Sequence, residues 1–91
     1  MECNRYLFRS NKGEVVVCPN EQRPYLWDLW IDDELICPAQ YSSPEEAVLR
    51  AYERDFGDEG LNKIYAGLQV SSDICQWTQL PAFRKGVSSY D

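Results

Sequence analysis

The sequence contains no histidine, and this single absence removes several classes of function. Histidine is the commonest general base, proton shuttle and metal ligand in proteins. Basic residues are also scarce, since 9 Lys and Arg stand against 15 Asp and Glu and give a net charge of −6. A chain with so few cations lacks the positive surface that binds nucleic acid or an anionic membrane. These absences argue against most enzymes and against direct nucleic-acid binding.

Long hydrophobic runs and closely spaced cysteines are missing as well. The longest nearly apolar segment, 25–31, contains an aspartate and is far shorter than the roughly 20 residues of a membrane helix. The N-terminus lacks the basic start and apolar run of a signal peptide, so we expect a cytoplasmic protein without membrane association. Cys3, Cys18, Cys37 and Cys75 form no Cys-x-x-Cys pair. We therefore expect reduced thiols, no bound metal and no cofactor.

What is present is typical of one small globular domain. The chain has 91 residues, of which 44% are hydrophobic, and it shows no repeat, linker or low-complexity tract. We expect a single domain over 1–91, with 84–91 frayed. The predicted fold is α+β: an antiparallel meander of about four strands, one main helix on one face, and a short helical or irregular C-terminal cap.

Alternation of polar and apolar residues predicts two hairpins. The first is closed by the turn formers Ser-Asn-Lys-Gly at 10–13, and the second by the acidic turn 32–34. In the second hairpin, Trp30 falls on the opposite face from Leu29. Pro38 cannot donate a ladder hydrogen bond and is expected to stop the last strand. The predicted strands are 5–9, 14–18, 25–31 and 35–37.

One helix is predicted over 44–56. Ser43, Pro44 and Glu46 place a hydroxyl at the N-cap, a proline in the first turn and a glutamate three residues after the cap, which together make a capping box. Gly57 suits the left-handed position after a helix end. The apolar side chains at helical spacing are Ala47, Val48, Ala51, Tyr52 and Phe56.

The pattern after this helix is ambiguous. Apolar residues in 61–68 follow helical spacing, yet 64–70 is equally compatible with a strand interrupted by Gly67. A second helix start is predicted at 72–76, and Pro81 is expected to end that helix.

Acidic residues are concentrated in the middle of the chain. Segment 28–59 holds ten acidic and two basic residues, a net charge of −8. One interpretation is a solvated face that serves solubility; another is a docking surface for a basic protein. Trp30 would either anchor such a surface or cover a second packing layer made by the C-terminal segment. The residues of this predicted docking surface are Asp28, Trp30, Asp32, Asp33, Glu34, Glu45 and Glu53.

Several segments of the chain resemble small uncharacterised proteins encoded by phages and prophages. The likeness is carried by the Trp-bearing hairpin 27–32, the Ser-Pro-Glu-Glu-Ala helix start in 41–47, Phe56-Gly57, and the closing segment 73–77 with its Asp and Trp. The resemblance implies no known active site. It implies a phage context in which small acidic proteins bind and modulate a host protein, and some imitate the charge of nucleic acid.

These observations together predict a small acidic, noncatalytic protein-binding module whose partner has a basic surface. One alternative is an acidic mimic of nucleic acid that inhibits a nucleic-acid-binding protein, with an affinity that falls steeply with salt. A second alternative is a small cysteine-dependent enzyme or redox protein. A homodimer is also compatible with the sequence, because an edge strand and spare aromatic side chains are available.

Overall fold

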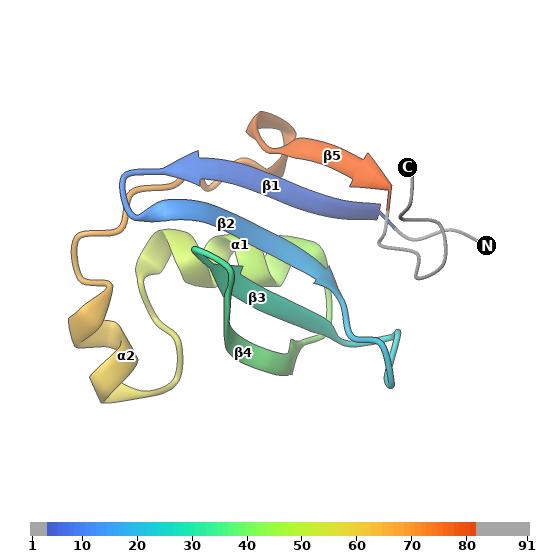
Figure 1. Cartoon of the computed structure of the whole chain (residues 1–91), viewed down its shortest axis with the longest axis horizontal. Coiled ribbons are helices and arrows are strands. Elements are labelled where there is room, and N and C mark those ends of the chain that lie inside the picture. Colours follow the sequence, from blue (N-terminus) through green and yellow to red (C-terminus); the bar gives the residue numbers. More distant parts are fainter. Residues whose placement is uncertain (1–3, 82–91) are drawn as a thin grey trace.

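The structure is a computed structural model that describes residues 4–81. It contains one antiparallel sheet of five strands in the order β4-β3-β2-β1-β5, with helices beside it (Figure 1). The predicted α+β class is therefore confirmed. The elements are β1 (Asn4–Ser10), β2 (Gly13–Pro19), β3 (Trp27–Ile31), β4 (Glu34–Tyr41), α1 (Pro44–Glu53), α2 (Glu59–Ile64), the 3₁₀ helix η1 (Ile74–Gln76) and β5 (Thr78–Pro81).

The first four strands form the predicted meander, and the turns explain its register. In the β1–β2 turn, Gly13 has φ +111°, and a Cβ there would lie 2.9 Å from the Asp32 side chain. The β3–β4 turn has two residues, Asp32 and Asp33, with φ of 53° and 67°. Left-handed backbone at both positions matches the twist of a two-residue hairpin, and aspartate tolerates it better than most residues. The acidic turn is thus confirmed.

Strand β4 continues through Pro38 to Tyr41, so the predicted end at residue 37 is wrong. Proline is tolerated because β4 is an edge strand, where a backbone nitrogen can face away from the ladder. The register with β3 shifts on both sides of Leu29, and Ala39 takes φ 48°. These irregularities bend the edge strand without ending it.

Helix α1 lies across one face of the sheet and closes the hydrophobic core (Figure 1). Rings from β1 complete this core, because Phe8 packs on Trp77 at 5.3 Å between centroids and Tyr6 on Trp27 at 6.2 Å. We call this side of the sheet the core face. The buried hydrophobic residues are Val15, Val17, Leu29, Ile31, Cys37, Tyr41, Ala47, Val48, Ala51, Phe56, Leu68, Val70 and Trp77.

The predicted start of α1 is confirmed. Glu46 donates its backbone N–H to the Ser43 hydroxyl at 3.1 Å, while the Glu46 carboxylate accepts from the backbone N–H and the hydroxyl of Ser42, both at 2.9 Å. The predicted end at residue 56 is wrong, since Arg54 takes the left-handed C-cap position with φ 60°. The chain must leave the helix there because Phe56 enters the core.

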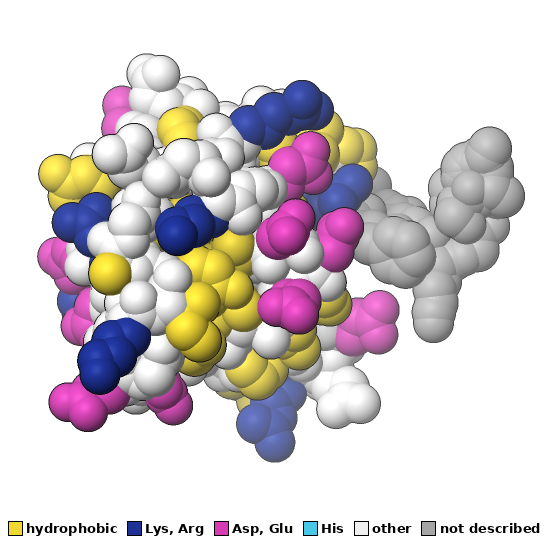
Figure 2. Space-filling model, turned by 60° about the vertical axis from the view of Figure 1, so that its left-hand side comes forward, with side chains coloured by type: hydrophobic (Ala, Val, Ile, Leu, Met, Phe, Trp, Pro, Cys, Tyr) yellow, Lys and Arg dark blue, Asp and Glu magenta, His cyan; other side chains and the backbone are white. Residues whose placement is uncertain are grey.

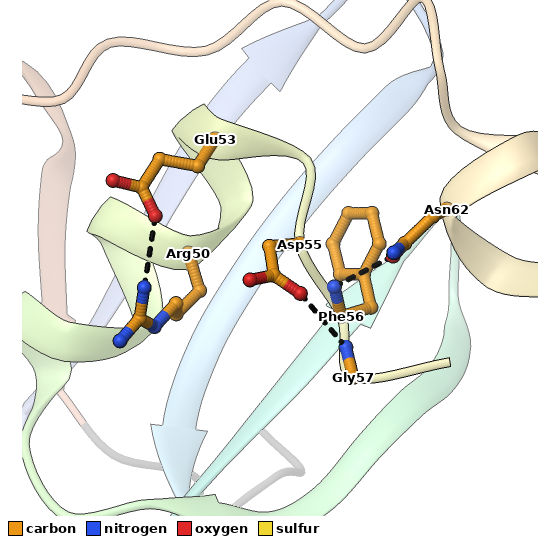
Figure 3. A network of polar contacts seen from close by, with 6 residues as sticks. All are labelled: Arg50, Glu53, Asp55, Phe56, Gly57 and Asn62. Atoms are coloured by element: carbon orange, nitrogen blue, oxygen red, sulfur yellow. Dashed lines mark hydrogen bonds and ion pairs between the residues drawn. The ribbon is translucent and has the colours of Figure 1, made fainter. Parts of the chain in front are cut away.

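The connection from α1 to α2 is held by side chains that bind backbone groups (Figure 3). Asn62 of α2 points back along the chain and accepts the Phe56 backbone N–H at 2.7 Å. The Phe56 carbonyl accepts from the Gln40 side chain of β4 at 3.1 Å. The Asp55 carboxylate accepts from the Gly57 backbone at 3.3 Å. Gly57 therefore serves this connection, with φ +77°, rather than the helix end.

The ambiguous region resolves into a short helix, a coil, a 3₁₀ turn and a strand. Segment 66–70 contains no strand, and Asn11 of the β1–β2 turn holds it by donating to the Gly67 carbonyl at 2.8 Å and accepting from the Gln69 N–H at 2.9 Å. The helix start predicted at 72–76 is present as η1, which Asp73 caps, but its predicted continuation to Pro81 is wrong because η1 has three residues and β5 follows.

Strand β5 pairs antiparallel with β1 and makes five strands where about four were expected. Trp77 fixes this path, since its ring is buried on Phe8 and its indole N–H donates to the Ser71 carbonyl at 3.0 Å. The predicted fraying of 84–91 lies outside the described residues. No helix within 4–81 is long and apolar enough to cross a membrane.

Candidate functional site

The side of the sheet opposite α1 carries a row of apolar side chains that we call the open face. Across the ladder, Trp30 pairs with Val16 and with Leu35, and Val16 pairs with Leu7. Paired residues of an antiparallel ladder share a face, and so do residues two apart. The open face comprises Leu7, Val16, Cys18, Trp30, Leu35 and Leu80, and none of the six belongs to the core cluster in which α1 packs.

Trp30 is the largest side chain of the open face and is half-buried among its neighbours. Its indole nitrogen is buried and makes no hydrogen bond of ordinary geometry. The nearby acceptor is the Cys18 sulfur, whose ionised form the indole would stabilise. The Trp30 ring therefore lies outside the core cluster and is only partly exposed.

The cysteine thiols of both faces are poorly suited to nucleophilic chemistry. Burial, and then the Asp28 carboxylate, raise the pKa of the Cys18 thiol to about 11. Burial also raises the pKa of Cys37, on the core face. Thiols with raised pKa stay protonated at neutral pH and react slowly. Within the described residues, Cys18, Cys37 and Cys75 are free. No group of three or more potential metal ligands occurs in residues 4–81.

Asp28 belongs to the predicted docking surface, but the structure buries it with 6% of its surface exposed. Its carboxylate accepts the Ala39 backbone N–H at 2.6 Å and the Asn20 side-chain amide at 3.0 Å. The irregular register of β4 leaves the Ala39 N–H without a strand partner, and the carboxylate supplies one. Asp28 is therefore a structural residue that holds the bulged edge strand, and it offers no exposed charge.

The acidic β3–β4 turn lies at one end of the open face. Asp32, Asp33 and Glu34 are all exposed, and Asp32 follows Trp30 by two residues. Glu34 pairs with Ile31, whose side chain is on the core face. Burial, and then the carboxylates of Glu34 and Asp32, raise the pKa of Tyr65. The turn thus borders both faces of the sheet.

The remaining predicted residues, Glu45 and Glu53, lie on α1 and so on the other side of the sheet from Trp30. Glu45 is in the first turn of α1, which follows the end of β4 farthest from the acidic turn. Glu53 pairs with Arg50 at 2.9 Å. The structure therefore brings Trp30 together with Asp32 and Asp33, and separates them from both helix residues.

The view in Figure 2 shows how hydrophobic and acidic side chains adjoin on one side of the molecule. Hydrophobic side chains form a continuous area there, and several Asp and Glu side chains gather beside it.

The sequence pattern alone does not indicate most of the open face. Leu7, Val16 and Leu35 are expected only as parts of strands, and Leu80 as part of a short apolar stripe with Ile74 and Trp77. The available signal was the weak alternation of 5–9, which puts Leu7 opposite its two aromatic neighbours. It becomes informative only with the register of β1 against β2 and β5, which no local pattern fixes.

Comparison with protein-family models, with curated proteins and with solved structures finds no match to this chain.

Proposed function

We propose that this protein is a noncatalytic protein-binding module that binds its partner through the open face, with Asp32 and Asp33 at the rim. The observation that carries the proposal is the row of Leu35, Trp30, Val16 and Leu7 across four strands, which none of the described helices covers. Apolar surface that a domain leaves uncovered marks interaction sites, and tryptophan is enriched at their energetic centres.

The expected partner is a protein whose contact surface is apolar in the middle and basic at its border. The exposed carboxylates at the rim favour a basic border through complementary potential. Nucleic-acid mimicry would instead need carboxylates in a continuous row. Asp28 is buried and Glu45 and Glu53 lie across the sheet from Trp30, so the acidic residues give this alternative little support. The raised thiol pKa values likewise weigh against cysteine chemistry.

A matched pair of leucines tests the proposal. Leu35 on the open face and Leu49 on α1 are 43% and 42% exposed, so lysine at either position should disturb the fold equally little. Tagged wild-type chain, Leu35→Lys and Leu49→Lys are compared for capture of partner protein from extracts of the native host. We expect Leu35→Lys to lose the captured protein and Leu49→Lys to retain it.

Thermal midpoints of both variants provide the control for folding. Retention of the captured protein by Leu35→Lys would show that binding does not use the open face. Loss by Leu49→Lys at an unchanged midpoint would show that binding uses α1 and is not confined to the open face. Repeating the capture over a series of salt concentrations distinguishes the alternative by the steepness of the loss, because a mimic of nucleic acid should release its target steeply, whereas binding with an apolar centre should weaken only modestly.

A further inference from the structure

The open face carries opposite charges along its two sides, and this arrangement suits a second copy of the same chain. Arg5 and Arg9 lie on β1, two residues before and after Leu7, with side chains on the same face. Asp32 and Asp33 lie at the β3–β4 turn. Strand β2 runs midway between β1 and β3. We propose that two copies pack open face to open face as a two-fold symmetric dimer.

The inference rests on the proposed function, because it takes the open face as the binding surface, and it names the occupant. A two-fold axis parallel to the strands and over β2 places β3 of one copy over β1 of the other. Trp30 then lies across from Leu7 of the second copy, and the two Val16 side chains meet at the axis. Two sheets packed in this way stand about 10 Å apart, filled by their facing side chains.

The same operation brings opposite charges together. An axis along the strands keeps the turn ends of both copies at the same end of the dimer, so Arg9 of each copy faces the Asp32 turn of the other. The Arg9 side chain is 79% exposed, and its partner within the chain, Glu14, is 3.6 Å away. An exposed pair at that distance is weak, so the arginine is free to bind across the interface.

Both edges of the sheet disfavour the competing edge-to-edge pairing. On β4, Pro38 lacks an N–H, and Ala39, with φ 48°, donates its N–H to the Asp28 carboxylate. On the other edge, β5 has four residues and ends at Pro81. Short strands, prolines and bulges are the features that prevent addition of a strand. These features favour packing through the open face over edge-to-edge pairing.

The size of the face predicts a weak dimer. Five strands at about 4.8 Å spacing and about five residues of 3.3 Å each give a face of roughly 24 × 17 Å, or about 400 Å² per copy. This is at the small end of specific interfaces, where association is transient. We therefore expect a dissociation constant on the order of micromolar or weaker.

Salt separates this dimer from a complex with a basic partner. Each copy carries a net charge of −6, so the copies repel at long range and salt screens that repulsion. Raising the salt should leave the dimer as tight or tighter. A complex with a basic protein should weaken under the same change.

Sedimentation equilibrium of the full chain, over a wide range of protein concentration and at low and high salt, tests the inference. We expect a monomer–dimer equilibrium that Leu35→Lys weakens at least about tenfold and Leu49→Lys leaves unchanged. Arg9→Gln and Asp32→Asn should each weaken it about two- to fivefold, and together no more than the stronger single change. Glu14 lies on β2 two residues before Val16, so the same axis also brings the two Glu14 carboxylates near each other, and Glu14→Gln should leave the dimer as tight or tighter.

A monomer at every concentration, a dimer that survives Leu35→Lys, or additive effects of Arg9→Gln and Asp32→Asn would overturn this arrangement. The capture experiment is independent of that result. A monomer that loses partner capture through Leu35→Lys refutes the dimer and supports the proposed function. A dimer sensitive to Leu35→Lys without any captured protein supports the dimer and refutes a separate protein partner.

Discussion

The two faces of the sheet are built from similar apolar residues, but they differ in what covers them. On the core face, Val17 and Leu29 have no exposed surface, because α1 and the segment around Leu68 and Trp77 pack against them. On the open face, Val16 and Trp30 are neighbours in the same ladder and stay partly exposed. The difference shows that burial in this fold depends on the face of the strand and hardly on the residue type.

The largest expected effect comes from truncating adjacent valines that point to opposite faces. Val17→Ala removes two methyl groups from a filled core and should lower the free energy of unfolding by about 2 kcal/mol or more. Val16→Ala should cost about 1 kcal/mol or less, because the methyl groups are already partly exposed. Urea denaturation measures both. Equal losses would show that the open face is covered as fully as the core face.

Asp28 sharpens the comparison, since its side chain lies on the side of the open face and yet is buried. Asp28→Ala leaves the Ala39 N–H and the Asn20 amide without their acceptor and should cost about 1–3 kcal/mol. Asp28→Asn keeps one carbonyl oxygen for the same bonds and should cost less. The free energy of unfolding distinguishes the two variants. An alanine variant as stable as the wild type would contradict the structural role.

Alkaline pH provides a smaller and directional test on the open face. The folded-state pKa of Cys18 is about 11, above the ordinary 9.0. A group whose pKa is raised by folding stabilises the folded state fully at pH values below its unfolded pKa. This stabilisation is lost as the pH rises through the folded-state pKa, here between about 9 and 11. Stability should therefore fall over this window, and less so in Cys18→Ala.

Cys75→Ala removes an exposed thiol and is the matched control. This variant should lose as much stability at alkaline pH as the wild type does. Part of the loss should persist in Cys18→Ala, because burial also raises the pKa of Cys37 and of Tyr41. A pH profile that Cys18→Ala leaves unchanged would show that this thiol is not shielded from water.

The smallest expected effect concerns the helix that covers the core face. The Ser42 backbone N–H lowers the pKa of the Glu46 carboxyl below 4.5. A lowered pKa stabilises the fold above pH 4.5, and the contribution is lost as pH falls through the folded-state pKa. Glu46→Gln should lower the free energy of unfolding by a few tenths of a kcal/mol near neutral pH. It should also make the stability depend less on pH at acidic pH. Substitution of its exposed neighbour, Glu45→Gln, should change the stability at acidic pH less than Glu46→Gln does.

Local chemistry explains which parts of this fold could be predicted from the sequence. The start of α1 depends on groups within a few residues of Ser43, and the face assignment of Leu29 and Trp30 depends on a period of two. Both predictions are confirmed. The end of α1 at Glu53 and the path of β4 through Pro38 depend on the distant contacts of Phe56 and on the edge position of β4. Those contacts have no local signature.

The same limit applies to the candidate site. Alternation correctly groups Trp30 with Asp28 and Asp32, but it contains nothing about burial. Asp28 looks like an exposed acid in sequence because its partner Ala39 is eleven residues away and is reached only through a bulge. The separation of Glu45 from the acidic turn likewise follows from the direction in which α1 crosses the sheet.

The pairing of β1 with β5 has a consequence for how the chain folds. Asn4 and Pro81 are ladder neighbours, so the earliest and latest described strands complete each other, and contacts between them span nearly the whole chain. Such nonlocal closure slows folding. Until β5 is in place, one edge of β1 has no ladder partner among the described strands, so the sheet closes on that side only through contacts between residues far apart in sequence.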